Sequence, residues 1–140
     1  MKKLIILVFS SLLFCFNLYS QSIKGYGLGD RFIEMDNHIK STVGGLEGTI
    51  VINTNDYNLI CSMGFVAKNV SQSTFDEFKE NVEQHYQVKL EKELTDWMAS
   101  KEGIGYSLSL EENNLVFVMI HNFLSDLHAE KQKRQNSKDF

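Results

Sequence analysis

The chain contains no proline and only two cysteines among its 140 residues. Because X-Pro bonds are the usual source of slow cis/trans isomerisation, its folding has no such step. Two cysteines, Cys15 and Cys61, are too few for a disulfide framework. A domain of this size buries roughly two-thirds of the surface of its unfolded chain, so we expect its core to hold it together without cross-links.

Motifs that would identify an enzyme or a metal protein are also scarce. The four histidines lack the spacing of a zinc site. The stretch GYGLGD at 25–30 differs from a dinucleotide loop because Asp30 replaces the third glycine and no strand precedes it. Cys61 and His121 are the one nucleophile–base pair to weigh, but Cys61 is in phase with apolar neighbours and is better interpreted as core. We expect no enzymatic activity, no metal and no cofactor.

Long apolar runs are limited to the N-terminus. Lys2 and Lys3 precede an almost unbroken apolar stretch over 4–16, and polar residues follow from Asn17. This pattern predicts a secretory signal peptide over residues 1–20, cleaved after Ser20. The run is shorter than the roughly 20 residues of a transmembrane helix.

Lipidation at Cys15 is disfavoured, because the residue before it is the bulky Phe14. The sequence therefore predicts a protein without a stable membrane anchor, exported to the periplasm or the medium. Cys61 is then the only cysteine of the mature chain, either as a free thiol or as half of an intermolecular disulfide.

Basic residues are outnumbered in the mature chain. Without Lys2 and Lys3 it holds 12 lysines and arginines against 18 acidic residues, a net charge of −6. This balance argues against nucleic acid and strongly anionic membranes as partners.

Two segments have helical periodicity. Phe32, Met35, Ile39 and Val43 recur at three and four residues, and Gly44-Gly45 follows as a possible helix end, so a helix is predicted over about 32–43. The segment 71–86 predicts a second helix, capped by Ser73 or Thr74, with one apolar stripe formed by Phe75, Phe78, Val82 and Tyr86.

Two further segments predict β-hairpins. Alternating apolar residues flank the turn-like NTNDYN at 53–58, and a second pair of arms flanks residues 111–114. The last arm, from Leu115 to His121, is apolar in both phases and predicts a central strand. Residues 87–101 are ambiguous: they could continue the second helix, or break near Gln87 into another helix or an irregular edge strand.

The expected fold is α+β, in the order helix–hairpin–helix–hairpin. A single antiparallel sheet of about four strands carries two main helices on one face, and a short helix follows at 123–129. The expected organisation is a signal peptide at 1–20, one domain at 21–128 and a solvated, disordered tail at 129–140.

Acidic residues are concentrated between 76 and 112. This segment holds ten acids against four lysines, a balance equal to that of the whole mature chain. We predict a non-enzymatic binding protein of inhibitor, immunity or assembly-factor type, which docks a basic protein through an acidic surface. The expected binding residues are Glu77, Glu80, Glu83 and Trp97.

The alternative function is a carrier of a small apolar ligand. It requires a pocket between helices and sheet, with aromatic residues as the expected lining: Phe75, Phe78, Phe117 and Trp97.

Overall fold

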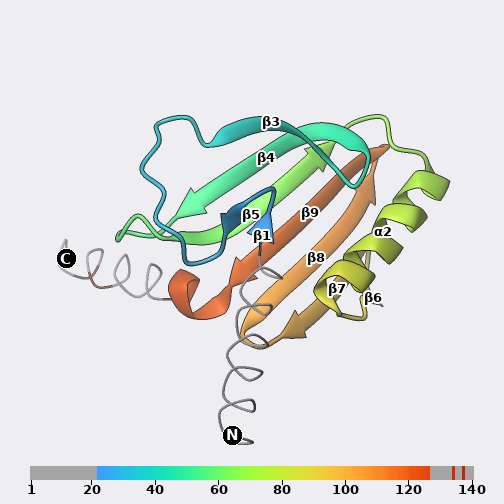
Figure 1. Cartoon of the computed structure of the whole chain (residues 1–140). Coiled ribbons are helices and arrows are strands. Elements are labelled where there is room, and N and C mark those ends of the chain that lie inside the picture. The colour runs from blue at the N-terminus through green and yellow to red at the C-terminus, as the bar shows by residue number, and fades with distance from the viewer. Residues whose placement is uncertain (1–21, 127–133, 135–136, 138–140) are drawn as a thin grey trace, which may run out of the picture.

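The computed structural model describes residues 22–126 together with Arg134 and Ser137 (Figure 1). The predicted signal peptide and all but two residues of the predicted tail lie outside the described residues, as does the end of the predicted short helix. The beginning of that helix is present, because residues 122–126 are helical. No helix in the described part of the chain is long and apolar enough to cross a bilayer.

The described residues form mainly β-structure with one long helix, α2 (Gln72–Tyr86). The strands are β1 (Ser22–Ile23), β2 (Tyr26–Gly27), β3 (His38–Val43), β4 (Leu46–Thr54), β5 (Ile60–Ala67), β6 (Glu91–Glu93), β7 (Asp96–Lys101), β8 (Ile104–Glu111) and β9 (Asn114–His121).

Seven strands make one antiparallel sheet in the order β3-β4-β5-β9-β8-β7-β6, and β1 pairs with β2 in a separate small hairpin. Strands β3 to β5 form one meander and β6 to β9 form another. Pairing of β5 with β9 joins the two meanders, and α2 connects them along the chain (Figure 1). The prediction that 115–121 is a central strand is confirmed, because β9 is the middle strand of the seven.

The predicted fold class is wrong. The molecule is predominantly β, with a seven-stranded sheet in place of four strands, and only one of the two main helices expected for an α+β fold is present in the described domain. The two hairpins and the helix at 71–86 were predicted correctly, as β4–β5, β8–β9 and α2.

The helix predicted over 32–43 is the main error. Residues 38–43 form β3, and Met35 is fully exposed in the loop before it. In β3 the side chains of Ile39 and Val43 are half-buried, while Lys40 and Thr42 are exposed, which is the period of two of a strand. The spacing of three and four residues was a coincidence: Ile39 and Val43 share one face of β3, whereas Met35 is exposed in the loop before it.

Gly44-Gly45, expected to end a helix, is a two-residue hairpin turn between β3 and β4. Both glycines have positive φ, at 56° and 81°, as a type I′ turn requires. The pairs Lys24-Gly25, Glu102-Gly103 and Glu112-Asn113 also have positive φ at both residues and close hairpins. A glycine pair between apolar segments therefore marks a hairpin here.

Helix α2 has local signals at both ends. Its N-cap is Ser71, not Ser73 or Thr74 as predicted, because the extended backbone of Ser71 lets its Oγ accept a hydrogen bond from Thr74 N at 3.2 Å. At the other end Gln87 is left-handed, with φ 53° and ψ 49°, and its N–H donates to Glu83 O. The ambiguous segment 87–101 is thus not helical, and it supplies strands β6 and β7.

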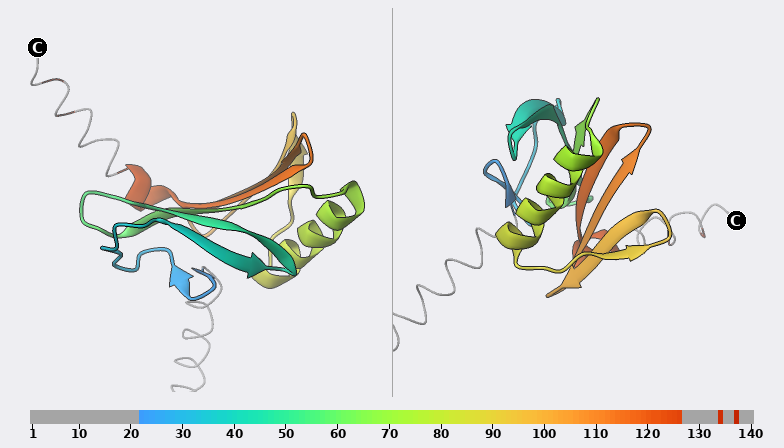
Figure 2. Two further views of the ribbon diagram at one scale, coloured as in Figure 1. Left: turned by 90° about the horizontal axis from the view of Figure 1, so that it is seen from above. Right: turned by 90° about the vertical axis from the view of Figure 1, so that its right-hand side faces the viewer.

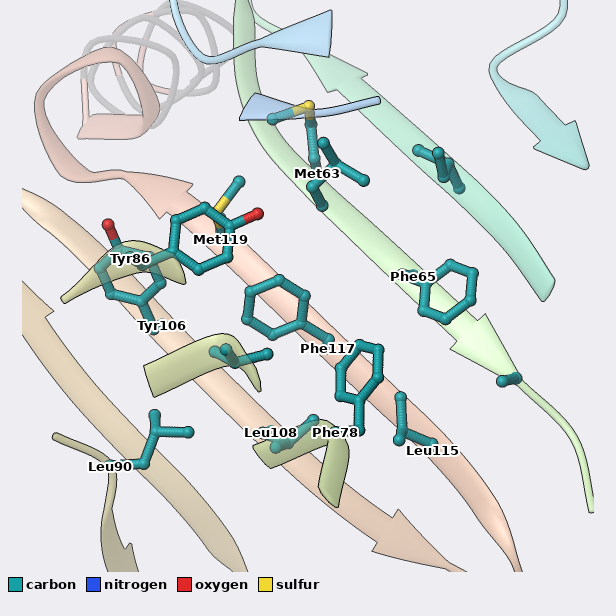
Figure 3. Packing of buried hydrophobic residues seen from close by; sticks show 14 of the residues in the cluster. Met63, Phe65, Phe78, Tyr86, Leu90, Tyr106, Leu108, Leu115, Phe117 and Met119 are labelled. Atoms are coloured by element: carbon teal, nitrogen blue, oxygen red, sulfur yellow. The ribbon is translucent and has the colours of Figure 1, made fainter. Parts of the chain in front are cut away.

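The core lies between α2 and one face of the sheet (Figure 3). Phe78 of α2 lies 6.0 Å from Phe65 of β5 and 6.2 Å from Phe117 of β9, measured between ring centroids. Tyr86, one turn beyond Val82, lies 5.8 Å from Phe117 and 5.5 Å from Tyr106. These five rings join the helix to three strands of the sheet.

The β1–β2 hairpin covers the same face of the sheet as α2 (Figure 2). Ile23 belongs to the core, and the hydroxyl of Tyr86 donates to Ser22 O at 2.8 Å. Residues 25–27 of the stretch 25–30 therefore belong to this hairpin, and the Asp30 carboxylate just beyond it accepts from Gly27 N at 3.0 Å. We call this covered side the inner face, and the opposite side the outer face.

Candidate binding site along helix α2

The solvent side of α2 carries a run of unneutralised acids. Asp76, Glu77 and Glu80 are all exposed, and we call them the acidic ridge. In the described residues neither Glu77 nor Glu80 forms an ion pair, and Asp76 accepts a hydrogen bond from the neutral Gln72 at 2.9 Å. The ridge therefore keeps its negative charge.

Lys79 is the helix's only lysine, and it is directed away from the ridge. Its Nζ forms an ion pair with Glu83 at 3.0 Å and lies 4.3 Å from the centroid of the Trp97 ring. Both contacts are on the side of α2 that faces β7. Lys79 thus stabilises the helix–sheet contact and leaves the ridge without a cation of its own.

Glu83 has a structural role. Besides the Lys79 ion pair, its carboxylate accepts a hydrogen bond from Leu90 N at 3.0 Å, which holds the chain after α2 against the helix. Partial burial raises the pKa of Glu83, but the hydrogen bonds from Lys79 and Leu90 and the nearby lysine charges outweigh it, so the pKa is lowered.

Trp97 is half-buried on the inner face of β7, where it packs against the core. Lys79 covers its ring, and Lys92 lies 5.9 Å from the ring centroid. The four residues expected to bind thus fall into two groups: Glu77 and Glu80 are on the open ridge, while Glu83 and Trp97 are joined through Lys79 at the helix–sheet contact.

The other acids of 76–112 are spread over the molecule. Glu91 and Glu93 are exposed on the edge strand β6. Glu102 and Glu112 lie in the turns at opposite ends of β8, which at about 3.3 Å per residue are more than about 20 Å apart. The acids that are clustered in the sequence between 76 and 112 therefore do not form one acidic face. Among them, the acidic ridge is the compact group.

A crevice of about 260 Å³ lies beside the ridge, between α2, the β1–β2 hairpin and the β3–β4 turn. Phe78 and Phe117 form its apolar floor, and Asn81 and His85 of α2 stand on its rim. Asn81 is one helical turn from Glu77, so the ridge and the crevice adjoin on one helix. The opposite wall carries Lys24.

The sequence did not reveal this crevice. Of the aromatic residues expected to line a pocket, Phe78 and Phe117 do so, whereas Phe75 and Trp97 lie elsewhere. The wall formed by Ser22, Ile23 and Gly44 depends on the β1–β2 hairpin and on the β3–β4 turn. The β1–β2 hairpin was not predicted, and the β3–β4 turn was misinterpreted as a helix end, so no local signal identified the wall.

Cys61 and His121 have separate partners. The Sγ of Cys61 lies 3.5 Å from Asn53 O, and the Nδ1 of His121 accepts from Leu124 N at 3.3 Å. Burial raises the pKa of the Cys61 thiol, although nearby backbone hydrogen bonds oppose this, so the reactive thiolate is disfavoured. In the described part of the chain no three His, Cys, Asp or Glu side chains are grouped to hold a metal ion.

Comparison with known proteins gives no relative. No protein-family model matches the chain, and neither the curated proteins nor the solved structures contain a significant match.

Proposed function

We propose that the protein is a non-enzymatic binding protein that docks a basic protein partner on α2, with the acidic ridge and the adjoining crevice as the contact. The observation that supports this most is the orientation of Lys79, which leaves Glu77 and Glu80 without a counter-charge. Carboxylates in this state attract a basic partner and speed its association. The crevice offers room for one apolar side chain of that partner.

This site differs from the one predicted from the sequence. Glu77 and Glu80 remain proposed contact residues, and Asn81 and His85 join them from the rim. Glu83 and Trp97 are left out, because their contacts with Lys79 hold the helix on the sheet. Export to the periplasm or the medium, inferred from the apolar N-terminus, remains part of the proposal.

The test is capture of a partner from the envelope and medium of the native host, with two double variants that change the charge equally. Glu77→Lys with Glu80→Lys reverses the ridge, whereas Glu111→Lys with Glu112→Lys reverses the distant β8–β9 turn. We expect a basic protein that is captured at low salt and is captured less at higher salt, because ions screen the contact. The ridge variant should lose it and the turn variant should keep it, and equal behaviour of the two variants would contradict the proposal.

A second candidate, favoured by the crevice, is a carrier of a small apolar ligand. The crevice is mostly apolar with a few polar rim groups, as ligand sites are, but its roughly 260 Å³ is at the small end. Native mass spectrometry of the protein isolated from its host distinguishes the two functions. A carrier should show a bound small molecule that Asn81→Trp displaces and that reversal of the ridge leaves in place.

A further inference from the structure

Nothing in the described structure covers the outer face of the seven-stranded sheet (Figure 2). This face is nevertheless apolar along its centre. The outward residues of the middle strand β9 are Val116, Val118 and Ile120, and Ile120 is 37% exposed. On β7 the outward Met98 is 43% exposed. An antiparallel sheet with one solvated face normally alternates apolar-in and polar-out, and β9 does not.

The strands beside β9 present mostly small side chains on this face. Ser62 and Gly64 point outward from β5, and Gly105 and Ser107 point outward from β8. Small side chains on both sides of a β-branched central strand allow another sheet to approach closely.

Opposite charges lie at the two ends of the face. Near β3 the exposed residues of the outer face include His38, Lys40 and Lys68, with one acid, Glu47. At the other end β6 and β7 present Glu91, Glu93 and Asp96 outward, near Lys89. The face thus has two lysines and one acid at one edge, apolar residues in the middle and an excess of acids at the other edge.

We infer that the outer face binds a second copy of this chain, sheet against sheet, with the two-fold axis running along β9. Rotation about that axis places β3 of one copy over β6 of the other, and leaves β9 over β9. The strand register then brings Lys40 over Glu93 and Val51 over Met98. Small side chains also meet, with Gly64 over Ser107, and Val118 meets its own copy.

The available area is sufficient for a dimer. Seven strands about 4.8 Å apart span about 29 Å, and three outward residues, which each strand except the short β6 has, span about 20 Å. The face therefore offers roughly 600 Å² per copy, or roughly 1,200 Å² in total, which is at the lower end of stable interfaces.

Such a dimer leaves α2 free in each copy. Because α2 and the β1–β2 hairpin cover the inner face, they point away from the shared interface (Figure 2). The dimer would carry its two acidic ridges on opposite sides. The inference does not depend on what those ridges bind.

Sedimentation equilibrium of the purified full-length chain tests the dimer at low and moderate salt. The wild type should be a dimer, and Val118→Lys, which places two like charges against each other on the axis, should make it a monomer with the same circular dichroism spectrum. A wild type that stays monomeric over the whole concentration range of the experiment would overturn the inference. A folded Val118→Lys variant that remains a dimer would also overturn it.

A charge swap tests the orientation without touching the apolar centre. Lys40→Glu alone and Glu93→Lys alone should each weaken the dimer at least tenfold, and the double variant should recover most of that loss because the two residues meet across the axis. A double variant no tighter than the single variants would show that this axis is wrong.

Discussion

At the scale of single residues, Glu83 shows how a side chain expected to bind a partner serves the fold. Its carboxylate has two partners, Lys79 Nζ and Leu90 N, each at 3.0 Å. Glu80, one turn earlier on the ridge side, is exposed and has no ion pair among the described residues. Both were assigned to one acidic face from the sequence, because spacing along a helix does not show which carboxylate finds a partner in the tertiary structure.

This difference between Glu83 and Glu80 predicts a dependence of stability on pH. The pKa of Glu83 is lower in the folded protein than its ordinary unfolded value of about 4.3, so its stabilisation is present above that pH and is lost as the pH falls through the folded value. Glu83→Gln should reduce the free energy of unfolding by about 1 kcal/mol at pH 7 and by much less at pH 3. Glu80→Gln is the matched control and should leave the free energy of unfolding unchanged at both pH values. Urea unfolding at pH 7 and at pH 3 measures both variants.

At the scale of elements, the β1–β2 hairpin and α2 depend on each other although they are far apart in the sequence. The Tyr86 hydroxyl donates to Ser22 O across 64 positions, and burial of Tyr86, with Tyr106 nearby, raises its pKa far above the ordinary value. The phenol therefore stays protonated and remains a donor at any ordinary pH. This contact closes one end of the crevice, where Ser22 and Tyr86 both line the wall.

Tyr86→Phe removes this hydrogen bond and keeps the ring. The Ser22 carbonyl then loses its donor, so we expect a loss of about 1 kcal/mol in stability and faster amide exchange in the β1–β2 hairpin than in β8 and β9. Hydrogen exchange followed by mass spectrometry measures both regions in one experiment. An unchanged hairpin would mean that its other contacts, among them the burial of Ile23, hold it in place.

At the scale of the whole molecule, one core spans both meanders. Phe117 of the central strand β9 is 1% exposed and contacts Phe78 and Tyr86 of α2. Because β9 also pairs with β5, the same strand joins the two halves of the sheet to the helix. The molecule should therefore unfold as one cooperative unit.

Phe117→Ala should lower the free energy of unfolding by about 3–5 kcal/mol, since it leaves a cavity between α2 and the sheet. Phe123, which is 65% exposed, offers the control: Phe123→Ala should change it by no more than about 0.5 kcal/mol. Chemical unfolding at one protein concentration, followed by tryptophan fluorescence and by circular dichroism, gives both values. Separate transitions from the two probes would contradict a single core.

Local patterns in the sequence determined those elements whose secondary structure depends mainly on residues nearby in the chain. The stripe from Phe75 to Tyr86 predicted α2, alternation around two turns predicted the β4–β5 and β8–β9 hairpins, and the doubly apolar run at 115–121 predicted the central strand. In each case the hydrophobic period and the turn or cap residues agree, so no distant contact was needed to identify the element.

Only the tertiary structure decided the secondary structure of the segments towards the two edges of the sheet. The period of 32–43 predicted a helix and that of 87–101 was ambiguous. Residues 38–43 and 96–101 become strands because β4 and β8 offer unpaired backbone groups beside them. Pairing of β5 with β9, the β1–β2 hairpin and the crevice likewise join residues distant in the chain. Pairing between strands is non-local and strand propensity depends on context, so these features could not be predicted from a short segment alone.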